Sequence, residues 1–268
     1  MNKIKALQSS MAENGIEDFG VCAFDSALVL STASQRRLPK NPQSIISAVF
    51  PYYSGLEEHG NISLYAMVSD YHQIVKPRLL LASDALSRAF PQNSFVAFTD
   101  ASPMDEIHAA QRAGLGMVGK NGLLITKKYS SFCFIGEIVT DLSLPATDFR
   151  DVCENCGACI KACPTGALTP HGFKKELCRS LITQKKGELT ALEAEEIQKG
   201  GLIWGCDLCQ LACPHSKNPS MTPIKEFKKL TTVISLDNLD EFYPKSSFNW
   251  RKKEVIIRNI KLAEKSGC

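Results

Sequence analysis

The residues of this chain best suited to chemistry are its eleven cysteines. Most of them form two spaced runs, each ending in proline: Cys153, Cys156, Cys159 and Cys163 before Pro164, then Cys206, Cys209 and Cys213 before Pro214. Gaps of two residues let neighbouring thiolates bind one iron–sulfur cubane, whereas a gap of three followed by proline turns the last thiolate towards a second cubane. The spacing therefore predicts two [4Fe–4S] clusters and electron transfer.

The number of ligands extends this prediction. Each [4Fe–4S] cluster takes four thiolates, so the two runs are one cysteine short. The missing ligand must be Cys22, Cys133, Cys178 or Cys268, and Cys178 is the best choice because it lies between the runs. The crossing of the fourth cysteine predicts two sets: Cys153, Cys156, Cys159 and Cys213 for one cluster, and Cys163, Cys178, Cys206 and Cys209 for the other.

Two readings of the cysteines remain open. Cys-x2-Cys pairs also bind zinc, so a pair of zinc sites is the alternative to the clusters. Cys22 and Cys133 lie in apolar strand contexts and are expected to be small buried apolar residues. Cys268 is terminal and is expected to be a free thiol.

Composition limits the class of protein. The chain has 268 residues and a net charge of +3, which is too small to indicate nucleic acid binding by itself. No signal peptide is evident, and no segment approaches the roughly 20 apolar residues that span a bilayer. Because thiolates need a reducing compartment, we expect a cytoplasmic protein without membrane contact. Residues 216–268 carry 11 Lys and Arg against 6 Asp and Glu, which favours either contact with RNA phosphates or a solvated amphipathic helix.

The elements that must position these residues follow from hydrophobic spacing. Short apolar runs predict strands at 19–24, 45–53, 93–100, 123–126 and 132–140, the last two as a pair. Helical spacing predicts a helix over 70–90 that Pro77 starts or kinks, and a second helix from Ser102 as N-cap to about Ala113, stopped by Gly114. Further helices are expected at 173–183, after the capping box of Thr190 and Glu193, and at 251–265.

The expected fold class is α+β. An N-terminal α/β domain (1–148) is followed by a ferredoxin-like double-cluster domain (149–215) and a short, basic helical tail (216–268). Asp100 closes a predicted strand, where α/β sheets place ligands, and is either a general acid or a helix-capping residue. His72 is a single helical histidine and is expected to be structural.

A glycine-rich segment, 114–122, resembles two phosphate-binding motifs without matching either. As a P-loop it has Asn121 in place of Ser or Thr, and as a dinucleotide fingerprint it follows a helix rather than a strand. The segment predicts a loop whose backbone approaches a bulky ligand, with Lys120 and Asn121 beside it.

Taken together, these segments resemble the epoxyqueuosine reductase family over about residues 15–215. The resemblance rests on Pro51-Tyr52-Tyr53, Tyr65-Ala66, Asp70-Tyr71-His72, Asp100, Ala113-Gly114-Leu115-Gly116, Gly119-Lys120-Asn121, Leu124-Ile125, Gly136-Glu137-Ile138, the eight cluster cysteines and Gly205-Cys206-Asp207-Leu208-Cys209-Gln210, with Ile257-Arg258-Asn259 as a weaker match.

The resemblance implies a function that the cysteines alone do not. It implies cobalamin bound in the α/β domain, reduction of its cobalt by one cluster, opening of an epoxide in tRNA, and Asp100 as proton donor to the leaving oxygen. The implied cofactor contacts are Tyr65, Asp100, Gly119, Lys120, Asn121, Leu124, Ser180, Thr183 and Gln184.

The resemblance also sets the expected partners. We expect tRNA as substrate, a low-potential electron donor, a monomeric state, and no C-terminal helical-repeat domain of the kind that helps relatives to grip tRNA. Two alternatives are an electron-transfer protein of the ferredoxin type and a corrinoid reductase that does not act on tRNA.

Overall fold

The computed structural model describes residues 2–55, 60–147 and 152–265, and it divides into two compact units. The first unit comprises 1–51, 72–119 and 123–154, and the second comprises 52–71, 120–122 and 155–268. These units differ from the three predicted segments. Residues 52–71 and the tail 216–268 fold with the cluster cysteines, and the predicted boundary at 148/149 lies outside the described residues.

The first unit is built on an antiparallel sheet of four strands. Its order is β1 (Asp18–Ala23), β2 (Ser44–Pro51), β6 (Cys133–Thr140) and β3 (Phe95–Thr99). The four corresponding predicted strands are confirmed. The predicted pairing of 123–126 with 132–140 is wrong, because β2 and β3 occupy both edges of β6. Instead β5 (Leu124–Ile125) pairs with β4 (Met117–Val118) in a separate hairpin.

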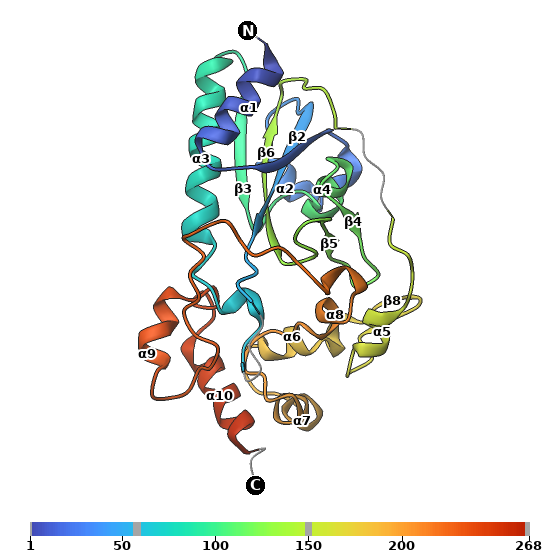
Figure 1. Cartoon of the computed structure of the whole chain (residues 1–268), viewed down its shortest axis with the longest axis vertical. Coiled ribbons are helices and arrows are strands. Elements are labelled where there is room, and N and C mark those ends of the chain that lie inside the picture. The colour runs from blue at the N-terminus through green and yellow to red at the C-terminus, as the bar shows by residue number, and fades with distance from the viewer. Residues whose placement is uncertain (1, 56–59, 148–151, 266–268) are drawn as a thin grey trace. The chain divides into compact units, whose positions relative to one another are not determined.

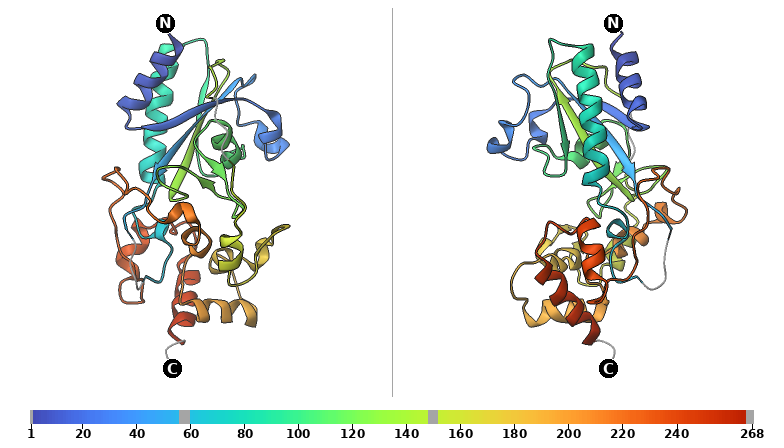
Figure 2. Two further views of the ribbon diagram at one scale, coloured as in Figure 1. Left: turned by 45° about the vertical axis from the view of Figure 1, so that its right-hand side comes forward. Right: turned by 90° about the vertical axis from the view of Figure 1, so that its left-hand side faces the viewer.

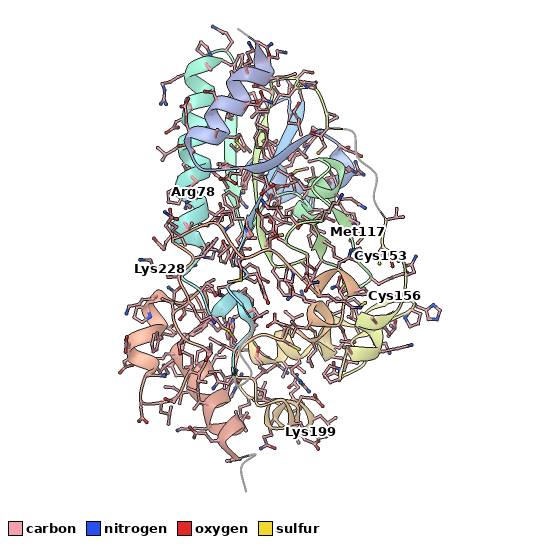
Figure 3. All side chains as sticks on the ribbon, in the orientation of Figure 1. Arg78, Met117, Cys153, Cys156, Lys199 and Lys228 are labelled. Carbon is pink, nitrogen blue, oxygen red and sulfur yellow. The ribbon has the colours of Figure 1, made fainter. Side chains whose placement is uncertain are left out.

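Two helices cover one face of this sheet, α1 (Lys3–Glu13) and α3 (His72–Ala89), as Figures 1 and 2 show. Arg78 of α3, labelled in Figure 3, donates a hydrogen bond of 2.9 Å to the carbonyl of Gly15, just beyond the end of α1. Because α3 begins at His72 and continues past Pro77, that proline does not start the helix.

Helix α4 (Glu106–Arg112) covers the opposite face, over β1, β2 and β6. Its N-cap is Asp105, whose carboxylate accepts a hydrogen bond from the His108 N–H. The prediction of Ser102 as N-cap is therefore wrong, and the Ser102 hydroxyl is instead bonded to Glu137 at 2.6 Å. The predicted stop at Gly114 is confirmed, since Gly114 has a φ of 81° directly after the helix.

The close packing of α4 on β1 depends on one glycine. A Cβ at Gly20 would lie 1.9 Å from the carbonyl oxygen of Ala113, at the C-terminal end of α4. On either side of this contact Cys22, Ile45 and Val139 are buried in the core between the helix and the sheet. Gly20 thus fixes the height of α4 above the face that carries Glu137.

Most of the remaining elements are short, apart from α7 (Ala191–Gly200) and α10 (Lys253–Glu264) in the second unit. The short elements are η1 (Ser26–Leu28) and α2 (Thr32–Gln35) in the first unit, and in the second unit η2 (Leu64–Ala66), α5 (Ala158–Ala162), β7 (Leu168–Thr169), β8 (Gly172–Phe173), η3 (Lys175–Leu177), α6 (Arg179–Thr183), α8 (Leu208–Leu211), η4 (Pro214–Ser216), α9 (Leu239–Phe242) and η5 (Tyr243–Lys245). The capping box of α7 and the C-terminal helix are confirmed. The predicted helix 173–183 is correct only in part, because Cys178 interrupts it in extended conformation.

The tail packs into the second unit. Helix α10 contacts α7 and buries Val255, Ile256 and Ile260, so it is an amphipathic helix with one covered face. Trp204 is fully buried beside Phe248, with ring centroids 5.4 Å apart. Within the described part of the chain, no helix combines the length and apolar character needed to cross a bilayer.

We expect Gly20→Ala to destabilise the first unit. The added methyl group collides with a backbone carbonyl, which cannot rotate away as a side chain can, and overpacking of this kind costs roughly 1–3 kcal/mol or more. Chemical denaturation followed by circular dichroism measures the loss. Ala23→Val on the exposed end of β1 is the matched control, and equal stability of both variants would contradict the close contact of α4 with β1.

Candidate functional site

The cluster cysteines of the second unit occupy two similar helix ends. Cys159 lies within α5 and Cys209 within α8, and these two helices pack together. Cys163 and Cys213 both leave their helices in extended conformation, each directly before proline. The extended backbone at both residues suits the prediction that the last thiol of each run turns towards a second cluster, which stays a prediction.

Cys178 lies with the second run of cysteines. Burial, and then the neighbouring sulfurs of Cys206 and Cys178, raise the pKa of Cys209 to about 12. Burial is also the main cause of the raised pKa of Cys206, with Cys178 among the groups that add to it. Three thiols in such proximity need positive charge to ionise together, which iron supplies. The position of Cys178 therefore fits the ligand that was missing from the count.

Backbone N–H groups surround another predicted ligand. Burial acts to raise the pKa of Cys163, but the N–H groups of Leu168, Thr165 and Ala167 and the Thr165 hydroxyl bond to its sulfur and leave the pKa lowered. Hydrogen bonds of this kind stabilise a thiolate and tune the potential of an iron–sulfur cluster. Ahead of α5, where Figure 3 labels Cys156, Asn155 and Gly157 have positive φ angles of 55° and 73° that turn the chain between the cysteines.

Among the described residues, no three His, Cys, Asp or Glu side chains form a group that could hold one metal ion. Outside the two runs, Cys22 is buried under α4 as expected, and Cys133 is only partly buried at the start of β6. Cys268 lies outside the described residues.

A chain of hydrogen bonds holds Cys206 in place. The N–H of Gly205 donates to the Thr183 hydroxyl at 2.9 Å, and the Asn259 amide donates to the carbonyls of Thr183 and Ile203 at 2.7 and 2.8 Å. Gly205 has a φ of 75°, and a Cβ there would lie 2.1 Å from the Ser63 hydroxyl. The predicted cofactor contact Thr183 is thus fully buried and braces the turn before Cys206.

The other predicted cofactor contacts differ in their accessibility. Lys120 is exposed, while Ser180 and Gln184 are half-buried and hydrogen-bonded to each other at 3.3 Å. The half-buried Tyr65 accepts a hydrogen bond of 2.6 Å from the Trp204 indole. Leu124 is buried in the β4–β5 hairpin.

One glycine of the 114–122 segment has a structural role. A Cβ at Gly116 would lie 2.3 Å from the carbonyl oxygen of Ile125, so this glycine permits the close return of the β4–β5 hairpin.

The predicted cofactor contacts are divided between the two units. The first unit contains Asp100, Gly119 and Leu124, and the second contains Tyr65, Lys120, Asn121, Ser180, Thr183 and Gln184.

Asp100 lies on an exposed turn directly after β3. Its side chain is 59% exposed, and its Oδ2 lies 3.5 Å from Nε2 of His72 at the start of α3. Both Asp100 and Ala101 have positive φ angles, 55° and 42°. Non-glycine residues persist in this conformation only where the surroundings hold them, and such strain gathers at functional sites. Asp100 does not cap a helix.

Two acidic residues near Asp100 escaped the sequence analysis as functional candidates. Glu137 is fully buried on β6, and burial raises its pKa to about 7. Glu106, half-buried on α4, has a pKa raised to about 8 by burial and then by Glu137 and Asp100. A charged residue between Ile135 and Val139, at a position that alternation turns inward, was the available signal for Glu137. The contact of His72 with Asp100 gave no signal in the sequence.

Two family models match the chain. Residues 33–101 match "Epoxyqueuosine reductase QueG, DUF1730", and residues 152–216 match "4Fe-4S double cluster binding domain". The epoxyqueuosine reductase of Listeria monocytogenes is 32% identical over 82% of this chain and 63% of that protein. The epoxyqueuosine reductase of Leadbetterella byssophila is 32% identical over 84% of this chain and 78% of that protein.

Solved structures share the fold. A crystal structure of epoxyqueuosine reductase with an epoxyqueuosine-modified tRNA-Tyr stem loop superposes with a TM-score of 0.82 at 23% identity, over 98% of this chain and 81% of that chain. The Bacillus subtilis enzyme, solved with its catalytic aspartate loop swung out of the active site, gives 0.81 at 24% identity over the same shares. This chain spans about 63% of the length of the Listeria relative. The chain belongs to the epoxyqueuosine reductase family.

Proposed function

We propose that this protein reduces the epoxide of epoxyqueuosine in tRNA to the alkene of queuosine. The observation that carries the proposal is Asp100, an exposed carboxyl group on a strained turn, in a chain of this family that also has thiols for two [4Fe–4S] clusters. The reaction consumes two electrons and two protons and releases water. The clusters are suited to deliver the electrons singly from a low-potential donor.

Cobalamin is the second cofactor in this proposal. When bound, it supplies a cobalt nucleophile that opens the epoxide. The side chains implied as its contacts have suitable chemistry, because Lys120, Ser180 and Gln184 offer an ammonium, a hydroxyl and an amide for the amide arms of a corrinoid. Thr183 is buried and accepts a hydrogen bond from the N–H of Gly205 in the same unit.

Asp100 is the proposed general acid. Its exposed carboxyl group is accessible to a bound substrate and, when protonated, can donate to the leaving oxygen of the epoxide. His72, 3.5 Å away, is placed to orient the side chain. The aspartate loop of the Bacillus subtilis relative leads us to propose that the Asp100 turn can also leave its working position. We place the reaction in the cytoplasm, where the thiols stay reduced and tRNA is present.

Cys178→Ala tests the ligand assignment. We expect the iron content of anaerobically reconstituted protein to fall from about eight to about four per chain, because one cluster loses a ligand. Iron analysis and electron paramagnetic resonance measure the change. Cys133→Ala removes a thiol that is outside both ligand sets and should keep all the iron. Full iron in Cys178→Ala would mean that another residue is the eighth ligand.

Asp100→Asn tests the general acid. The amide has the same shape but no acidic proton, so we expect turnover of epoxyqueuosine-containing tRNA to fall by about 10²–10⁴-fold while the iron and corrinoid spectra stay unchanged. Nucleoside analysis of the digested tRNA measures turnover. Asp84→Asn, at an exposed position of α3, is the control. Undiminished turnover in Asp100→Asn would exclude Asp100 as proton donor. A chain that binds no corrinoid would instead be an electron-transfer protein.

A further inference from the structure

A carboxyl group lies buried beneath the Asp100 turn. Glu137 is in the middle of β6, between the inward residues Ile135 and Val139, on the face that α4 covers. In the sheet it is directly opposite Ser47 of β2 and Phe98 of β3. An acidic residue in this otherwise apolar layer is costly, because burial disfavours its ionised form.

The hydrogen bonding of this carboxyl group is incomplete. Oε2 accepts from the Ser102 hydroxyl at 2.6 Å, whereas Oε1 is buried without a hydrogen-bond partner among the described residues. The hydroxyl of Ser47 is buried and unbonded in the same way. Glu137 therefore relies on Ser102 for the hydrogen bond that stabilises its charge.

Ser102 is part of the turn that carries Asp100. Its hydroxyl oxygen also accepts from the Met104 N–H at 3.1 Å, which fixes the chain where the turn ends. From the other side, Arg37 donates to the Ala101 carbonyl at 2.6 Å and stacks on Phe98 at 5.2 Å. The turn is thus held by the Arg37 bond at its surface and the Ser102 bond beneath it, beside the contact of Asp100 with His72. The Ser102 bond ends on a carboxyl group whose pKa is raised to about 7, chiefly by burial.

The charged neighbours of Glu137 come from every element around it. Burial raises its pKa to about 7, the Ser102 bond acts to lower it, and Asp105 adds to the increase. Glu106 on α4 and Asp100 on the turn are further acids of this group. On β1, burial and then Glu137 raise the pKa of Cys22 to about 11.

The nearby cations have partners other than Glu137, Arg37 among them through its hydrogen bond to the Ala101 carbonyl. Arg112 of α4 forms an ion pair with Asp25, His72 with Asp100, and His108 with Asp105. The described ion pairs include none on Glu137, so its state of ionisation depends on burial, on Ser102 and on these acids.

We propose that Glu137 is a positioning residue that holds the Asp100–Ser102 turn in its working position through Ser102, more tightly when the carboxyl group is ionised. Thermodynamic linkage supports the tighter hold by the ionised form. Because the Ser102 bond favours the ionised form of Glu137, ionisation must strengthen that bond by the same factor. The inference rests on the proposed function, because the proposed function is what gives the Asp100 turn a catalytic role.

We call the hydrogen bond between Ser102 and Glu137 the latch. Hydrogen exchange of the free protein tests its effect on the turn without any substrate. Between pH 6 and 8, after correction for intrinsic exchange rates, protection of the backbone amides of residues 100–102 and 104 should rise in the native chain. Ser102→Ala should lose roughly tenfold of that protection at pH 8, the factor expected for one charge-assisted hydrogen bond. Glu137→Gln keeps an acceptor oxygen but cannot ionise, so its protection should be independent of pH. Native protection in Ser102→Ala would overturn the proposal.

The melting temperature provides a second readout for Glu137. Its folded pKa of about 7 exceeds the ordinary 4.5, so between these values the folded chain binds more protons than the unfolded chain and loses stability as pH rises. The melting temperature of Glu137→Gln relative to the native chain should therefore increase from pH 5 to 7 and then level off. A difference that does not change with pH would refute titration of Glu137 in this range. Glu17→Gln, at an exposed acid, is the matched control.

Kinetics then link the latch to catalysis. In the reconstituted enzyme, Ser102→Ala should lower kcat about tenfold with little change in KM for tRNA, and Glu137→Gln should remove the limb of the kcat–pH profile near 7. An unchanged profile in Glu137→Gln would refute the catalytic role of the latch. If the native chain shows no turnover while the exchange results hold, the proposed function fails and the latch stands.

Discussion

The turn after β3 is the constraint on which the candidate acid site depends. Asp100 and Ala101 both adopt a left-handed backbone conformation that residues other than glycine seldom keep without support. That support comes from Ser102 below and Arg37 above. The Ser102 bond requires β3 and β6 to pair in the observed register with α4 packed on them, because its acceptor, Glu137, lies 35 residues further along the chain.

The cluster region is held together by side chains that bind no metal. Thr183 accepts the N–H of Gly205, and Asn259 of α10 donates to the carbonyl of Thr183, so the C-terminal helix braces the residue before Cys206. The tail 216–268 therefore belongs to the compact unit of the clusters. Three of its basic residues, Lys253, Arg258 and Lys261, lie on α10, whose apolar residues Val255, Ile256 and Ile260 are buried, so this helix combines a packing face with a polar one.

The sequence was most informative where structure depends on neighbours in the chain. Thr190 and Glu193 predicted the start of α7, because a capping box depends on residues within one helical turn. The prediction of Ser102 as a helix N-cap was wrong. Its hydroxyl donates to the carboxyl group of Glu137, which is distant in the sequence. Local patterns do not reveal which of two available partners a hydroxyl will bond.

The rule that singled out Asp100 does not apply to this sheet. The expectation of a ligand site at the carboxyl ends of strands holds for parallel sheets, whose strand ends gather at one edge. Here β3 runs antiparallel to β6, so the end of β3 lies beside the first half of β6, and Phe98 is paired with Glu137. The surroundings of Asp100 consequently include a buried residue of the neighbouring strand as well as His72 at the start of α3. In an antiparallel sheet, the residues to examine beside a candidate acid are therefore its cross-strand partners.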